Sequence, residues 1–326
     1  MLDNNIIIVG KIVFAMKENR TVVGIGEVLW DILPDGKKIG GAPANFAYHV
    51  SQFGLQSLVV SAIGDDVLGQ EIIGTFRDKG LNSLISTVPY PTGTVQVELD
   101  MAGIPQYIIK EGVAWDYIPF TPELEALASN TCAVCFGSLA QRSTVSRNAI
   151  NRFIDTMPKD NGTLIVFDAN LRQSFYSEDV LKQSMTQCNV LKINDEELPT
   201  VCRTSGIPES DPESQCRALL NRYNLKILIL TCGVNGSYIF THDAKSFLAT
   251  PQVKVADTVG AGDSFTAAFT ASILSGLPVP AAHRKAVDVS AFVCTQNGAM
   301  PVLPAKLLTE DAKAARSVRV WDRVPI

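Results

Sequence analysis

Short runs of Val, Ile and Leu alternate along most of the chain with segments whose apolar residues recur at helical spacing. The runs predict buried strands, and the segments between them predict amphipathic helices. This alternation is typical of a parallel sheet covered on both faces. The expected strands are 22–25, 58–63, 133–139, 164–168, 190–193 and 226–231. The expected helices are 44–53, 69–79, 145–156, 178–188 and 212–223.

Residues 92–110 break this pattern, because apolar and polar residues alternate there with period two. Val95, Val97 and Leu99 are the apolar members, and a turn is expected at residues 102–103. Such a segment predicts a hairpin, which would project from a parallel sheet as a β flap over a cleft and exclude water from it. An exposed apolar strand face often pairs with its own copy, so a homodimer through the flap is expected.

The expected domain organisation is one α/β domain at residues 21–326, with the flap inserted around 92–110. Residues 1–20 are interpreted as an N-terminal extension, because the first convincing strand begins after them. The apolar stretch at 6–16 is too short for a membrane span, which needs roughly 20 apolar residues. Neither a membrane nor a secretory segment is therefore predicted.

Composition and charge narrow the function classes. The 326 residues are 46% hydrophobic and 19% charged, as in ordinary globular proteins. A net charge of −5 without a basic run argues against a nucleic-acid partner. Seven cysteines in strand-like and helix-like segments favour a reducing, cytoplasmic location over a disulfide framework. Cys132 and Cys135 have C-x-x-C spacing but lie in a strand-like run, which favours core packing over a metal site.

The strongest chemical signal is the segment Asp-Thr-Val-Gly-Ala-Gly-Asp at residues 257–263, which leads into a helix of small apolar residues ending near 275. Gly260, Ala261 and Gly262 would present free N–H groups at the positive end of that helix, which makes an anion site. The glycines imply close approach of a ligand to the backbone. Asp263 would repel a resting phosphate but could take a proton from an attacking hydroxyl. The alternative is an Asp favoured only by the helix dipole.

A second glycine-rich segment precedes the helix expected at 44–53. Gly40 and Gly41 come just before it, and Asn45 would lie in its first turn, where an amide suits sugar hydroxyls. A tight turn followed by a helix start is the alternative. Asp31 lies beyond the carboxyl end of the first strand, where open α/β sheets bind ligands, although many loop aspartates have no such role.

Several common nucleotide and hydrolase motifs are missing from the sequence. There is no G-x-x-x-x-G-K-S/T segment, which excludes the standard P-loop. Leu29 stands where the third glycine of a dinucleotide-binding fingerprint would be, which disfavours a nicotinamide oxidoreductase. No G-x-S-x-G elbow occurs.

Taken together, these segments resemble the PfkB, or ribokinase-like, carbohydrate kinases. Residues 40–54 and 257–269 look like the two signatures of that family, and Gly-Glu-Val-Leu-Trp-Asp-Ile-Leu-Pro at 26–34 is similar to the fructokinases within it. The resemblance covers residues 22–304. It implies a ribokinase-like three-layer α/β/α sandwich with a mostly parallel central sheet and a small β flap, or lid.

The resemblance also implies roles for individual residues. Asp263 would be the general base, with Gly260, Ala261 and Gly262 as the anion hole. The sugar would be bound by Asp31, Gly40, Gly41 and Asn45. ATP would be bound by Asn194, Thr231, Gly233, Gly236, Asn170 and Arg172. Glu197 would hold Mg²⁺ through water, and Asp257 and Val259 would contribute to a K⁺ site.

Two positions depart from the family's pattern. Cys232 stands where Leu is common, and Ala169 stands where many members have Pro. The expected function is an ATP- and Mg²⁺-dependent sugar kinase, with fructose as the preferred acceptor. Ribose, 2-keto-3-deoxygluconate and nucleosides are alternative acceptors, because flap residues that the sequence does not position decide the acceptor. A sugar-binding regulator on the same fold is the alternative from another class.

Overall fold

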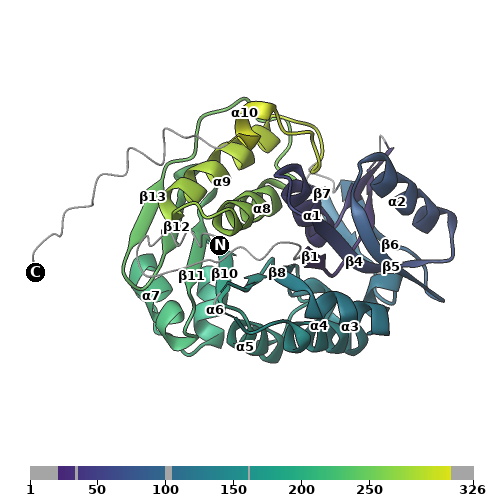
Figure 1. Ribbon diagram of the computed structural model, residues 1–326, viewed down its shortest axis with the longest axis horizontal. Coiled ribbons are helices and arrows are strands. Elements are labelled where there is room, and N and C mark those ends of the chain that lie inside the picture. The colour runs from purple at the N-terminus through teal and green to yellow at the C-terminus, as the bar shows by residue number, and fades with distance from the viewer. Residues whose placement is uncertain (1–20, 34–35, 100–104, 161, 310–326) are drawn as a thin grey trace, which may run out of the picture.

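A nine-stranded sheet forms the centre of the protein in a computed structural model (Figure 1). The structure describes residues 21–309, apart from 34–35, 100–104 and 161. The strand order is β13-β12-β11-β10-β9-β8-β1-β4-β5; all strands from β11 to β5 are parallel, and β12 and β13 form an antiparallel edge. The strands are β1 Thr21–Ile25, β4 Ser57–Gly64, β5 Asn82–Val88, β8 Thr131–Phe136, β9 Leu164–Asp168, β10 Val190–Asn194, β11 Ile227–Thr231, β12 Ser237–Phe240 and β13 Lys245–Leu248.

Helices cover both faces of the large sheet and complete the expected three layers (Figure 1). On one face lie α3 Pro122–Ser129, α4 Thr144–Thr156, α5 Glu178–Gln187, α6 Leu198–Thr204 and α7 Pro212–Arg222. On the other lie α1 Ala42–Gln52, α8 Ala261–Leu274, α9 Val279–Cys294 and α10 Ala305–Leu308. Helix α2 Val67–Asp78 packs near β4 and β5. Within the described ranges, no helix is both long and apolar enough to cross a membrane.

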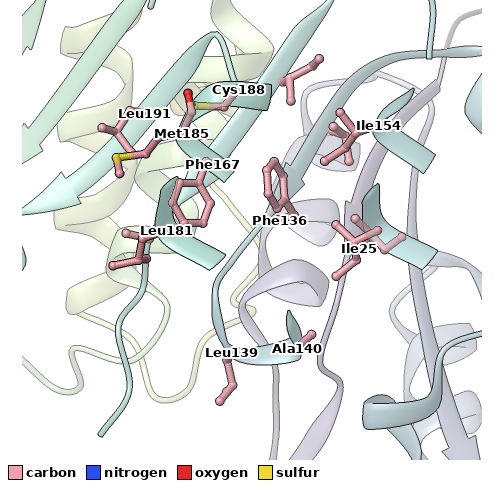
Figure 2. Packing of buried hydrophobic residues seen from close by; sticks show 14 of the residues in the cluster. Ile25, Phe136, Leu139, Ala140, Ile154, Phe167, Leu181, Met185, Cys188 and Leu191 are labelled. Atoms are coloured by element: carbon pink, nitrogen blue, oxygen red, sulfur yellow. The ribbon is translucent and has the colours of Figure 1, made fainter. Parts of the chain in front are cut away.

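The two faces of the sheet separate the apolar core into layers, because successive strand residues point in opposite directions. In β1, Val23 and Ile25 pack with the α3–α7 layer, whereas Val22 packs with α1, α8 and α9. Phe136 and Phe167 lie side by side in the first of these layers, with ring centroids 5.2 Å apart (Figure 2). Burial on both faces explains why the strands read as continuous apolar runs.

The predicted hairpin is present as β6 Gly93–Leu99 and β7 Pro105–Ile109, which pair antiparallel. The predicted turn at 102–103 lies outside the described residues. Two strands that the sequence pattern did not predict, β2 Leu29–Leu33 and β3 Gly36–Gly40, extend the flap into a separate four-stranded sheet of order β3-β2-β6-β7. Val95, one of the apolar residues expected to meet a second copy, is buried within the protein itself. The homodimer through the flap stays a prediction.

One predicted strand is too long. The run at 133–139 was expected to be extended throughout, but β8 ends at Phe136 and a 3-10 helix, η2 Leu139–Arg142, follows. The N–H and hydroxyl of Ser138 both donate to the carbonyl oxygen of Ala169, which turns the chain away from the sheet edge. An apolar run does not reveal such a local hydrogen bond.

Candidate active site

The two glycine-rich segments meet at the N-termini of α1 and α8. Nδ2 of Asn45 donates to Oδ2 of Asp263 at 2.7 Å, although the two residues are 218 positions apart in the chain. Asn45 is buried, and its Oδ1 has no hydrogen-bond partner among the described residues. An unpaired buried amide oxygen is costly. A hydroxyl donor placed beside it would relieve that cost, so its role in sugar binding stays a prediction.

The first turn of α8 is open to an anion. Gly260 is its N-cap residue with φ of 78°, and no side chain caps the turn. An uncapped N-terminus leaves N–H groups without partners and carries the positive end of the helix dipole. A Cβ at Gly260 would lie 2.6 Å from the Cβ of Ala299, so only glycine fits there. Of the three N–H groups in the expected anion hole, that of Ala261 already donates to the carbonyl oxygen of Thr258 at 3.3 Å, and the anion hole itself stays a prediction.

The Asp263 carboxyl is poised to change its proton near neutral pH. Burial raises its pKa from 3.8 to about 6, and the Asp168 carboxylate contributes in the same direction. The Asn45 hydrogen bond and the charges of Lys192 and Arg172 partly offset this rise. A carboxyl with a pKa near 6 is suited to act as a general base.

The lid supplies Asp31, the carboxyl of the expected sugar site. Asp31 lies on β2, so the segment after the first strand is itself a strand of the lid rather than a simple loop. Burial raises the pKa of Asp31 to about 6, and it lies within electrostatic reach of Arg172, Asp257 and Lys38. A Cβ at Gly40 would lie 2.6 Å from Oδ2 of Asp31. Gly40 therefore makes room for that carboxylate.

Gly41 is required by the path of the chain into α1. Its φ is 115°, and a Cβ there would lie 2.4 Å from the carbonyl oxygen of Glu27. Glu27 was not singled out by the sequence analysis. Its side chain is buried, with Oε2 unpaired among the described residues, and burial raises its pKa from 4.5 to about 7. The only sequence signal for it is its place just after β1.

A buried ion pair that the sequence pattern did not reveal lies beneath α8. Nζ of Lys192 lies 3.0 Å from Oδ1 of Asp168, and the Thr266 hydroxyl donates to Oδ2 of the same carboxylate at 3.1 Å. Asp168 ends β9 and Lys192 lies on β10. A charged residue inside an otherwise apolar strand run was the available signal.

Asn194 and Glu197 hold one another at the end of β10. The Glu197 N–H donates to Oδ1 of Asn194 at 2.8 Å, and the Asn194 N–H donates to Oε2 of Glu197 at 2.9 Å. Oε1 of Glu197 accepts the Leu171 N–H at 2.8 Å. Glu197 therefore joins the loops after β9 and β10. Each of its oxygens accepts one backbone N–H and keeps a lone pair, which fits the expected contact to Mg²⁺ through water.

The loop after β9 carries Asn170 and Arg172. Asn170 has a positive φ of 41°, an uncommon value for a residue with a side chain. Arg172 is exposed, and its charge partly offsets the raised pKa values of Glu27, Asp31 and Asp263. Its guanidinium is therefore within electrostatic reach of all three carboxyls, and its contact with ATP stays a prediction.

The expected nucleotide turn follows β11. Thr231 pairs with Asn194 in the sheet, and its carbonyl accepts the Asp195 N–H at 3.0 Å. Gly233 and Gly236 have φ of 51° and 108° at the two ends of the short 3-10 helix η3 Gly233–Asn235. The start of this turn therefore lies beside Asn194, and its role in nucleotide binding stays a prediction.

The expected cation segment brings two loops together. Oδ1 of Asp257 accepts the Val259 N–H at 3.0 Å, and Oδ2 accepts the Gly298 N–H at 3.1 Å. Nζ of Lys38 on the lid lies 3.4 Å from Oδ2. Although burial acts to raise the pKa of Asp257, these donors lower it overall. Among the described residues, this carboxylate thus contacts two N–H donors and the Lys38 ammonium, and the K⁺ site stays a prediction.

This site combines an uncapped helix N-terminus, the adjacent Asp263 carboxyl and the Asn45 amide, with a small second sheet that carries Asp31 beside them. Residues 16–306 match the pfkB family carbohydrate kinase model, and the chain belongs to that family. It is a ribokinase-like sugar kinase.

Named relatives are similar over most of their length. A probable fructokinase-5 from Arabidopsis thaliana is 28% identical over 316 residues, covering 89% of this chain and 96% of the relative. An ATP-dependent 6-phosphofructokinase from Thermoanaerobacterium thermosaccharolyticum is 25% identical, covering 90% and 94%. The crystal structure of a fructokinase with bound ATP from Xylella fastidiosa shares the fold, with a TM-score of 0.76 at 21% identity and coverage of 89% and 97%.

Proposed function

We propose that the protein is an ATP- and Mg²⁺-dependent fructokinase that forms fructose 6-phosphate. The observation that carries the proposal is the Asp263 carboxyl beside the uncapped N-terminus of α8, held by Asn45. A carboxyl in that place is hard to reconcile with a site that only binds anions, because it would repel them. It suits a site in which a hydroxyl loses its proton while it attacks phosphorus.

In the proposed reaction, Asp263 accepts the proton of the acceptor hydroxyl as the new O–P bond forms. The bond between the γ-phosphorus and its bridging oxygen breaks, and the electron pair leaves with ADP. The N–H groups of Gly260, Ala261 and Gly262 stabilise the charge on the transferring group, which is the main catalytic need in phosphoryl transfer. Mg²⁺, when bound, neutralises charge on the phosphates.

The sugar is proposed to lie between the lid and α1. Asp31 and the free Oδ1 of Asn45 accept hydrogen bonds from its hydroxyls, while Gly40 and Gly41 shape the backbone around it. The lid sheet covers the sugar and excludes water, the competing nucleophile.

ATP is proposed to lie across the ends of β9, β10 and β11. The groups assigned to it are Asn170, Arg172, Asn194, Thr231, Gly233 and Gly236. Glu197 would hold Mg²⁺ through water. Asp257 and Val259 would form a K⁺ site in the same part of the protein.

A coupled ADP-release assay tests the proposal. The purified protein is given MgATP, with and without K⁺, and fructose, ribose, 2-keto-3-deoxygluconate, glucose or adenosine. Fructose 6-phosphate is added to the panel because one relative is named a 6-phosphofructokinase. A preference for fructose supports the proposal, and a preference for another acceptor rejects that assignment while retaining the kinase reaction.

The variant Asp263→Asn tests the chemistry. It should fold and bind the sugar but lose about 10² to 10⁴ in turnover, the usual contribution of a general base. Asp243→Asn, an exposed site distant in sequence from the motif, is the control. Turnover of Asp263→Asn close to that of the wild type would reject the proposed role.

A further inference from the structure

The buried ion pair of Asp168 and Lys192 lies directly against the first turn of α8. The two side chains are only 7% and 9% exposed. A Cβ placed on Gly262 would lie 3.2 Å from Nζ of Lys192, so the missing side chain lets the ammonium approach the helix backbone. The Thr266 hydroxyl, one turn further along α8, fixes the other oxygen of Asp168. The ammonium of Lys192, which extends from β10, is therefore held behind the expected anion hole by Asp168 of β9 and the first turns of α8.

This placement is not what fold stability favours. A cation near a helix N-terminus opposes the helix dipole, and a buried ion pair seldom adds net stability. Burial acts to lower the pKa of Lys192, but the carboxylates of Asp168 and Glu197 raise it above its usual value, so the ammonium keeps its charge. A permanent positive charge beside an anion site is useful when an anion binds there.

We propose that Lys192 is a positioning residue of the phosphoryl-transfer reaction, whose buried charge behind Gly262 strengthens the anion hole and acts on the neighbouring Asp263 carboxyl. The inference rests on the proposed function, in which Asp263 takes the proton. Buried charges are weakly screened, so the ammonium acts across the α8 backbone without touching the substrate. The Asp168 carboxylate holds the ammonium in place. Its negative charge limits the net positive charge that Lys192 adds behind the anion hole.

The two partners act on Asp263 in opposite directions. Lys192 favours the ionised form of Asp263, and Asp168 disfavours it. The other polar and titratable groups that act on Asp263 or lie in its electrostatic surroundings are Asn45 on α1, Glu27 after β1, Cys135 on β8 and Arg172 after β9. A change at Lys192 should therefore raise the pKa of Asp263, and a change at Asp168 should lower it.

The experiment compares Lys192→Met, Asp168→Asn and the double variant with the wild type. Lys226→Met is the matched control, because Lys226 is partly buried just before β11, at the end of the sheet opposite the site. The first readout is the pH at which kcat falls on the acid side. The second is the carbon-13 carboxyl resonance of Asp263, titrated without ATP or sugar and assigned with Asp263→Asn.

Lys192→Met should move both midpoints to higher pH and Asp168→Asn to lower pH, each by at least about 0.5 pH unit. The double variant should lie between them. At a pH where Asp263 is ionised, Lys192→Met should also lose about 10- to 100-fold in kcat, less than loss of a direct oxyanion donor costs. Lys226→Met should leave both midpoints and kcat unchanged.

Midpoints that move in the same direction in both single variants, or in neither, would overturn the inference, because a loss of packing has no reason to produce opposite signs. If one single variant does not fold, the double variant is compared with the other, and the sign of that difference decides in the same way. The resonance does not depend on turnover. Opposite shifts of the resonance together with an active Asp263→Asn variant would reject the proposed function while supporting the electrostatic coupling.

Discussion

Replacement of Glu27 by Gln should stabilise the unliganded protein at alkaline pH. Glu27 is 3% exposed, its Oε2 has no partner among the described residues, and burial raises its pKa from 4.5 to about 7. The folded state therefore holds this proton more tightly than the unfolded chain does. The stability that this carboxyl contributes is fully present below pH 4.5 and is lost as the pH rises through 7.

The size of the loss follows from the two pKa values. A tenfold difference in proton affinity corresponds to about 1.4 kcal/mol. Integrated between pH 4.5 and pH 8.5, the difference between the folded and unfolded states costs about 3 kcal/mol of unfolding free energy. Gln cannot ionise and has nearly the same shape, so Glu27→Gln should not show this loss.

Urea unfolding at pH 4.5 and pH 8.5 measures the effect in the wild type, Glu27→Gln and Glu125→Gln. Glu125 is exposed on α3, so its variant should follow the wild type at both values. The informative quantity is the change in unfolding free energy between the two pH values, which should be about 3 kcal/mol smaller in Glu27→Gln. Equal changes in the wild type and Glu27→Gln would refute the reasoning.

Three further predictions concern the site and its support. Gly260→Ala should lower the unfolding free energy by about 1 to 3 kcal/mol more than Gly276→Ala in urea unfolding, because both glycines have positive φ but only Gly260 would bring its Cβ against Ala299. Asp116→Ala should lower the unfolding free energy by about 3 to 5 kcal/mol, because it leaves the buried Arg142 guanidinium without its carboxylate partner. Glu178→Ala removes one partner of an exposed ion pair and should lower it by under about 1 kcal/mol in the same assay. If Asp263 is the base, kcat should fall tenfold per pH unit below about pH 6, and a flat profile down to pH 5 would contradict that role.

The large sheet was predictable because its strands are buried on both faces. Val22, Val23 and Ile25 are all buried, two against one helical layer and one against the other, so β1 appears as an unbroken apolar run. The lid strands β2 and β3 gave no such signal. Lys37 and Lys38 are exposed on β3, and β2 follows β1 after only a short turn. The pairing of β2 with β6 joins segments more than 60 residues apart, and local periodicity does not report such a contact.

The site was predictable in its motifs but not in its charges. Asp263 and Asn45 each stand in the first turn of a helix that follows a glycine-rich segment, so both could be proposed from local sequence. The fold brings Nδ2 of Asn45 to 2.7 Å from Oδ2 of Asp263. Lys192 and Asp168 lie in strand runs without a motif, and their pairing depends on β9 and β10 being neighbours in the sheet. Glu27 stood out only through its burial, a property of the folded chain.

The glycines of the site have a packing role beside the one that the sequence suggests. They are expected to admit a ligand close to the backbone, and at three of them an atom of the protein also lies close to the place that a Cβ would take. Ala299 does so at Gly260, the Lys192 ammonium at Gly262, and the Asp31 carboxylate at Gly40. Each glycine thus allows a functional or supporting group to approach the helix N-termini where the ligands are expected. A glycine-rich motif of this kind therefore reports the packing that builds an anion site, and the ligand uses the space that this packing leaves open.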